Sequence, residues 1–91
     1  MADLVWTASA SDDLMAIVDY ISEDNPDAAM ALLEEIEDKV AQIPAFPARG
    51  RPGRVKGTRE LVVRPNYVVV YAASPGAVSV LRVLQAAQMW P

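Results

Sequence analysis

The sequence contains neither cysteine nor histidine among its 91 residues. Without cysteine, the chain can form no disulfide, thiolate metal site or cysteine nucleophile. Without histidine, it lacks the commonest general base and the commonest metal ligand in proteins. These two absences exclude Ser-His-Asp and Cys-His catalytic arrangements, and we expect no metal and no other cofactor.

Long apolar runs are absent as well. No segment approaches the roughly 20 apolar residues that cross a membrane, and the first residues do not resemble a signal peptide. We therefore expect a cytoplasmic protein with no membrane association. The length predicts one small domain, residues 1–91, and the apolar content of 53% is ample for its core. A core of this size gives modest stability, so a partner that covers apolar surface would matter.

Charge is distributed unevenly along the chain. Residues 1–48 hold 11 acids and a single base, whereas residues 49–91 hold seven bases and a single acid, Glu60. The bases concentrate between positions 49 and 64, with Arg82 further on. Such a basic run is suited to phosphates or to an acidic protein, and it is equally typical of an arginine-rich loop in solvent.

The second half of the chain predicts three antiparallel strands, 61–64, 67–73 and 78–84, because these segments are rich in Val, Leu and Tyr. Turn residues separate them: Pro65-Asn66 and Ser74-Pro75-Gly76. Tyr67 and Tyr71 share one strand face, where core packing is their expected role. A meander of this size leaves an apolar face bare, so the first half of the chain must cover it.

The first half predicts a strand at 4–6 and two helices. Ser9, Ser11, Asp12 and Asp13 provide an N-cap and first-turn acids, and apolar residues at 14, 17, 18 and 21 form one helical face. Asn25-Pro26 restarts the chain as a second helix. Its core face contains Ala29, Leu32 or Leu33, Ile36, Val40 and Ile43, and its acids, which include Glu34 and Glu35, are expected in solvent.

Residues 44–57 predict a long loop without regular structure, since they include three prolines and three glycines. Two helices with so short a connection fold back as a hairpin. The predicted fold is therefore α+β, in the order β-α-α-β-β-β, with an N-terminal strand and an αα-hairpin packed on a mostly antiparallel sheet. No phosphate-loop motif occurs, and the adjacent pairs Asp12-Asp13 and Glu34-Glu35 are expected to be solvated charges.

Several segments, in this order, resemble the RelE/ParE superfamily of toxins from bacterial type II toxin–antitoxin modules, and most closely its ParE, or plasmid-stabilisation, branch. The segments are WTASA at 6–10, Asp13-Leu14, Asn25-Pro26, GTREL at 57–61, YVVVY at 67–71 and VLRVLQAAQMWP at 80–91. The resemblance covers nearly the whole chain and implies the same fold that the patterns predict.

The resemblance implies two rival activities. RelE-like members are ribosome-dependent mRNA endoribonucleases with an arginine in a Y-R-x-x-Y strand and a Tyr or His near the C-terminus, whereas ParE-like members poison DNA gyrase. This sequence has Val68 at the arginine position and Gln85 where many relatives have histidine. RNA cleavage needs a proton acceptor and a group that stabilises the charged phosphorane. We therefore expect a gyrase inhibitor with no catalytic residue; an endonuclease that relies on arginines alone and a non-toxic antitoxin-binding module are the alternatives.

The resemblance also implies a cognate antitoxin in a hetero-oligomer. We expect acidic antitoxin residues to meet Arg49, Lys56 and Arg59, because only this half of the chain carries matching charge. Direct binding of nucleic acid is left open. We predict that the target-binding residues are Arg51, Arg54, Arg59, Arg64, Arg82, Gln85 and Trp90.

Overall fold

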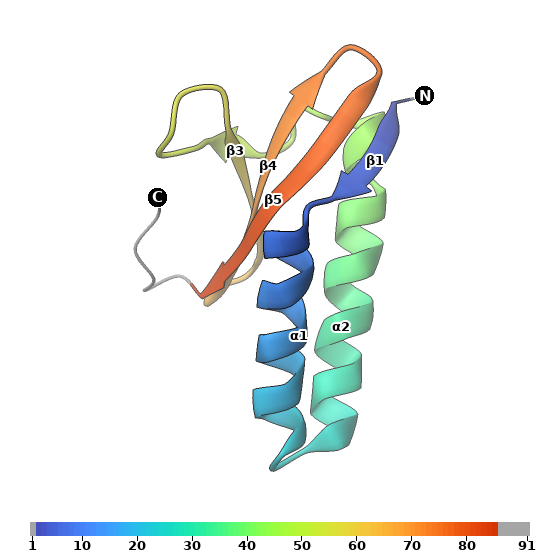
Figure 1. Cartoon of the computed structure of the whole chain (residues 1–91), viewed down its shortest axis with the longest axis vertical. Helices are drawn as coiled ribbons and strands as arrows, with labels where there is room; N and C mark the ends of the chain where they lie inside the picture. Colours follow the sequence, from blue (N-terminus) through green and yellow to red (C-terminus); the bar gives the residue numbers. More distant parts are fainter. Residues whose placement is uncertain (1, 86–91) are drawn as a thin grey trace.

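A helical hairpin packs against a five-stranded sheet in the computed structural model, which describes residues 2–85 (Figure 1). The elements in chain order are β1 (Asp3–Trp6), α1 (Ala8–Ser22), α2 (Pro26–Ala41), the 3-10 turn η1 (Ile43–Ala45), β2 (Arg51–Pro52), β3 (Arg59–Arg64), β4 (Tyr67–Ser74) and β5 (Ala77–Gln85). The predicted α+β class and element order are confirmed. Within the described residues, no helix is both long and apolar enough to span a membrane.

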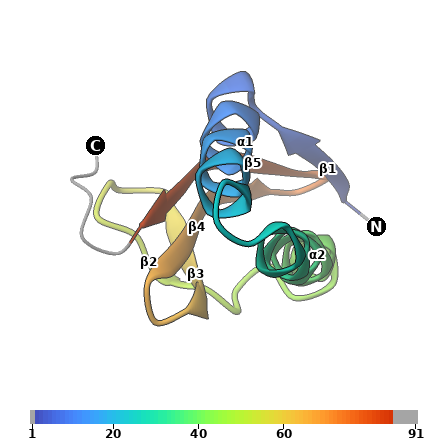
Figure 2. The same cartoon turned by 90° about the horizontal axis from the view of Figure 1, so that it is seen from below.

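The strand order in the sheet is β1-β5-β4-β3-β2. Strands β2 to β5 are antiparallel to their neighbours, whereas β1 pairs in parallel with β5, with Trp6 opposite Val80. The N-terminal strand therefore lies beside the last strand of the chain. Figure 1 shows that the lower half of the hairpin extends beyond the sheet, and Figure 2 shows α2 end-on.

The helix starts follow capping chemistry, although one cap differs from the prediction. Asn25 caps α2 as predicted, with its Oδ1 accepting the Ala28 N–H at 3.0 Å. Helix α1, however, is capped by Thr7, whose hydroxyl oxygen accepts the Ala10 N–H at 3.2 Å and donates to the carbonyl of Val80 at 2.9 Å. The predicted cap among Ser9, Ser11, Asp12 and Asp13 is wrong, because Thr7 also fastens the helix start to β5.

The core lies between the hairpin and one face of the sheet. The predicted helix positions are buried, except that Ile21 is only partly buried, and Leu32 is buried while Leu33 is only half-buried. Ile43 is buried too, but in η1 and not in α2. Tyr67 and Tyr71 are in this core, as predicted.

The strands end close to where the turn residues place them. Pro65-Asn66 and Pro75-Gly76 form the two tight turns, and Gly76 has a φ of +89° that side chains rarely adopt. The prediction that residues 44–57 have no regular structure is wrong in two places, η1 and β2. Strand β2 forms because the loop folds back along β3, with Arg51 opposite Glu60.

Candidate interaction surface

Glu60 of β3 binds two arginines of the basic loop that precedes this strand. Its carboxylate is the only charged side chain that is buried within residues 2–85, with 3% of its surface exposed. The Oε1 atom accepts from Arg51 Nη2 at 3.1 Å, and Oε2 lies 3.5 Å from Arg54 Nε and accepts the Arg54 backbone N–H at 3.3 Å. Two predicted target-binding arginines are therefore fixed by an ion pair to one carboxylate of β3.

A second set of contacts fixes the start of the loop. The hydroxyl of Tyr71 donates to the Pro47 carbonyl at 2.7 Å and accepts the Gly50 N–H at 3.0 Å. Arg59 Nη1 donates to the carbonyls of Gly50 at 2.8 Å and Ala48 at 3.4 Å. A β-carbon at Gly50 would lie 2.7 Å from the Tyr71 hydroxyl, so only glycine allows this approach. Arg59 thus has a structural role that its sequence context did not indicate.

Arg64 binds the second helix. Its Nε donates to Glu35 Oε1 at 2.8 Å, and Lys39 Nζ lies 3.8 Å from the other oxygen of the same carboxylate while it donates to the Val63 carbonyl at 3.0 Å. The hydrogen bond from Arg64 lowers the pKa of Glu35, and the charges of Arg64 and Lys39 act in the same direction. The expectation that Glu35 is merely solvated is wrong.

Arg82 binds the first helix. Its Nε and Nη2 donate to the two carboxylate oxygens of Asp13 at 2.7 and 2.9 Å, and the Val83 N–H also donates to Asp13, at 3.0 Å. The hydrogen bond with Asp13 raises the pKa of Arg82. Asp13 is therefore not the solvated charge that the sequence predicted, but a bidentate partner 69 positions away.

The structure brings only part of the predicted target-binding set together. Arg51, Arg54 and Arg59 surround the start of β3. Arg64 lies at the far end of the same strand, about 17 Å along it, and Arg82 is on β5. Gln85 ends β5, where it lines a hollow of about 270 Å³ with Asp13, Tyr20 and neighbouring residues. Trp90 lies outside the described residues.

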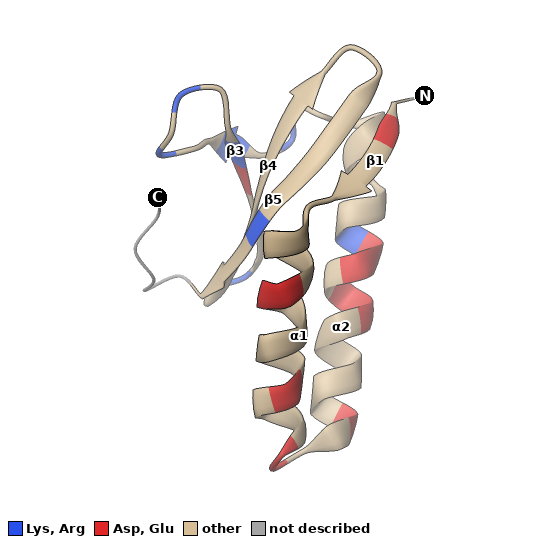
Figure 3. Ribbon diagram, viewed as in Figure 1, with Lys and Arg blue, Asp and Glu red and all other residues tan. Residues whose placement is uncertain are grey.

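The cations fall into two groups by their partners. Lys39, Arg51, Arg54, Arg64 and Arg82 each have a carboxylate partner. The cations that have none among the described residues are the predicted antitoxin-binding residues: Arg49 donates to an amide, Arg59 donates to backbone carbonyls, and Lys56 is exposed. Figure 3 shows the wider division, with most acids on the helices and most bases around β2, β3 and their loop. We call Arg49, Lys56 and Arg59 the uncompensated cations.

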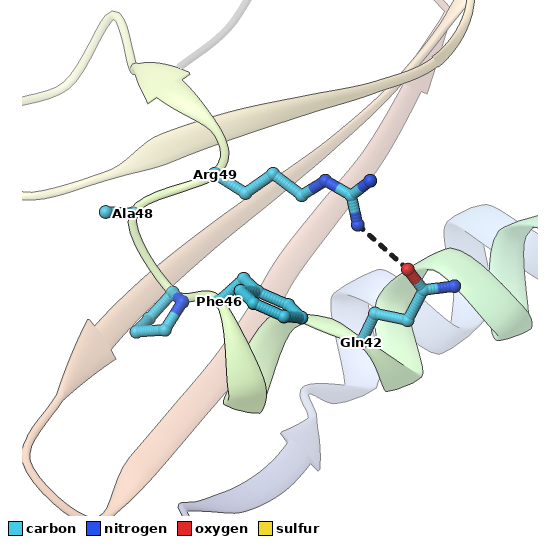
Figure 4. Close-up of a pocket in the computed structure, with 5 residues that line it drawn as sticks. Gln42, Phe46, Ala48 and Arg49 are labelled. Atoms are coloured by element: carbon cyan, nitrogen blue, oxygen red, sulfur yellow. Dashed lines mark hydrogen bonds between the residues drawn. The ribbon is translucent and has the colours of Figure 1, made fainter.

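One surface feature was missed by the sequence analysis. Residues 42–49 form a shallow pocket of about 610 Å³, lined by Gln42, Phe46, Pro47, Ala48 and Arg49 (Figure 4). The Phe46 side chain is 62% exposed there. The sequence does contain a signal for it, namely a phenylalanine between two prolines in an otherwise polar, basic loop. A large apolar side chain in such a loop has little around it that can cover it.

Several known proteins are similar to this chain in sequence or in fold. Residues 4–90 match the family model described as ParE toxin of type II toxin–antitoxin system, parDE. The chain is 42% identical over 87 residues to Y4kP, a candidate toxin of Sinorhizobium fredii, covering 94% of this chain and 90% of that protein. It is 38% identical over 89 residues to toxin RelE2 of Caulobacter vibrioides, covering 98% and 100%. A solved chain from the chromosomal ParDE system of P. aeruginosa matches with a TM-score of 0.85 and 26% identity, covering 93% of this chain and 96% of that one. This chain therefore belongs to the ParE toxin family of type II toxin–antitoxin systems, within the wider ParE/RelE superfamily.

Proposed function

We propose that this toxin inhibits DNA gyrase and that a cognate antitoxin neutralises it. The observation that carries the proposal is the match to the ParE family over residues 4–90, together with the similarity to a solved ParDE toxin at 26% identity. Gyrase acts on DNA in the cytoplasm, and we infer the same location for the toxin.

The chemistry at two positions favours gyrase over RNA as the target. The strand position at which RelE-like nucleases carry an arginine is occupied by Val68, which is 2% exposed and so packs within the protein. Gln85, at the end of β5, cannot exchange a proton near neutral pH. Cleavage of RNA needs a proton acceptor and a nearby positive charge, and these two side chains supply neither.

We propose that the target meets the loop around Glu60. The side chains of Arg51 and Arg54 are about half exposed, and Lys56 lies between them and β3 in an exposed loop. DNA phosphates or acidic protein residues would complement these charges. Arg64 and Arg82 form ion pairs with the helices. We include them in the target-binding surface, but the proposal depends mainly on Arg51, Arg54 and Lys56.

The test is a supercoiling assay with purified gyrase and plasmid DNA. We expect linear DNA to accumulate when toxin is added and to disappear when the toxin is first mixed with its antitoxin. A parallel translation reaction with ribosomes and mRNA reports on the alternative. Ribosome-dependent mRNA cuts without gyrase trapping would show that the protein is an endonuclease. The absence of both effects would show that it is a module that only binds its antitoxin.

A further inference from the structure

A second hollow lies beside the pocket at Phe46. It measures about 260 Å³ and is lined by Lys39 near the end of α2 and by Leu61 and Val62 of β3. Gln42 and Arg49 line both hollows, so the two are adjacent. We call the two hollows together the Phe46 groove.

The groove carries apolar surface that the fold itself does not use. Phe46 is 62% exposed and Val62 is 43% exposed. The backbone around Phe46 is nevertheless fixed, since its N–H bonds to the Gln42 and Ile43 carbonyls and its own carbonyl accepts the Arg49 N–H at 3.0 Å. The turn therefore fixes the backbone that carries the exposed ring, and a partner does not have to order it. Preorganised apolar surface of this kind favours binding, because less conformational entropy is lost.

Arg49, which lines both hollows, has no carboxylate partner within residues 2–85. Arg49 Nη1 donates to Gln42 Oε1 at 2.8 Å, so its acceptor is a neutral amide (Figure 4). The arginines at 51, 54, 64 and 82 all reach carboxylates. An incoming carboxylate at Arg49 would form a charge-assisted hydrogen bond, which is about twice as strong as a neutral one, and would release Gln42 to solvent.

We propose that the Phe46 groove binds a segment of the antitoxin that presents a large apolar side chain to Phe46 and Pro47 and an Asp or Glu carboxylate to Arg49. The apolar ring gives affinity by burial, and the uncompensated guanidinium of Arg49 fixes the register of the segment. This inference rests on the proposed neutralisation by an antitoxin, but not on gyrase being the target.

The experiment measures antitoxin affinity, association rate and dissociation rate at about 0.15 M salt for two groove variants and two comparison variants. Arg49→Gln removes the groove charge, and Lys56→Gln removes an equal charge outside the groove, where we expect only general attraction to an acidic partner. Phe46→Gln removes the exposed ring, and Met15→Gln removes a side chain of similar exposure, 53%, from α1. Melting curves confirm that each variant folds, which we expect because Arg49 and Phe46 are at the surface.

We expect each groove variant to weaken antitoxin binding about tenfold or more, mainly through faster dissociation. Lys56→Gln should slow association without changing the dissociation rate, and Met15→Gln should change affinity less than about twofold. Four unchanged affinities would overturn the proposal. Equal weakening by Arg49→Gln and Lys56→Gln, with no effect of Phe46→Gln, would also overturn it, because general electrostatic attraction would then be sufficient.

The same four variants in the gyrase assay separate this inference from the proposed function. Groove variants that bind antitoxin normally but no longer trap gyrase would assign the groove to the target and overturn the inference. A wild-type toxin that fails to trap gyrase, with antitoxin binding still weakened in both groove variants, would overturn the gyrase proposal and leave the groove assignment intact.

Discussion

The paired arginines and the uncompensated cations differ in what their charge does. Arg51, Arg54, Arg64 and Arg82 neutralise carboxylates and hold the loop, the helices and the sheet together. The uncompensated cations, Arg49, Lys56 and Arg59, leave their charge without a carboxylate partner among the described residues. Charge that is already compensated contributes to folding, and charge that is not compensated is available to a partner. Removing the carboxylate partners of the first group should therefore lower stability, whereas removing a member of the second should affect binding, and four variants test that contrast.

The largest effect is expected for Glu60→Ala. The substitution leaves Arg51 and Arg54 without their shared carboxylate and the Arg54 N–H without its acceptor. Both arginine side chains are about half exposed, so water compensates part of the loss, and we expect the free energy of unfolding to fall by about 2–3 kcal/mol. Urea unfolding measures it, and Glu34→Ala, an exposed helix position, is the control. Equal stability of the two variants would show that the loop is not held through Glu60.

Asp13→Asn should have the next largest effect. An amide keeps the shape but provides only one acceptor oxygen, so Arg82 loses its bidentate partner and the Val83 N–H competes for the remaining oxygen. We expect a loss of about 1–2 kcal/mol by the same urea measurement. The matched control is Asp12→Asn at the adjacent, exposed position. If both variants lose the same stability, net charge and not the pair with Arg82 is responsible.

Glu35→Gln should have a smaller effect that depends on pH. Because the folded state lowers the pKa of Glu35, its charge stabilises the fold above the ordinary pKa of glutamate, and this contribution disappears as pH falls through the lower folded pKa. The variant should melt below wild type at pH 7, and the gap should close in acid below about pH 4. Melting curves at pH 7, 5 and 3 test it; a gap that widens in acid would contradict the sign.

Lys56→Gln should have the smallest effect on folding. Lys56 is exposed, and the described residues give it no partner, so stability should stay within about 0.5 kcal/mol of wild type. Its charge should instead raise the rate of association with an acidic partner at low salt, and this advantage should disappear at high salt. Association rates with the antitoxin at two salt concentrations test this. A clear loss of stability would place Lys56 with the paired arginines.

The fold was predictable from sequence where local chemistry determines it. Asn25-Pro26 starts α2 and Pro75-Gly76 turns the last hairpin because both act on the backbone within a few residues. Thr7 was not predictable as the cap of α1, since what distinguishes it from Ser9 is its bond to Val80, 73 positions away. The same holds for the pair of Asp13 with Arg82: a solvated aspartate and a bidentate partner look alike until the sheet places them together.

The candidate surface was predictable in charge but not in partners. Clustering of bases identified the loop region, yet it could not separate Arg49 from Arg51, because the difference lies in Glu60, which is buried only after β2 folds back on β3. Phe46 was overlooked since a single phenylalanine has no periodic pattern. Which side chains a loop leaves outside depends on three-dimensional packing, and no local rule reports it.

The parallel pairing of β1 with β5 has a consequence for synthesis of the toxin. A ribosome makes Asp3–Trp6 long before Ala77–Gln85, so the partner of β1 does not exist until a further 74 positions, from Asp3 to Ala77, have been translated. The bonds of Thr7 to Val80 and of Asp13 to Arg82 wait for the same moment. Contacts between residues this distant in sequence form late and slowly. A chain on which β5 has not yet been made therefore cannot complete this sheet, so the fold cannot form before the ribosome has passed Ala77–Gln85.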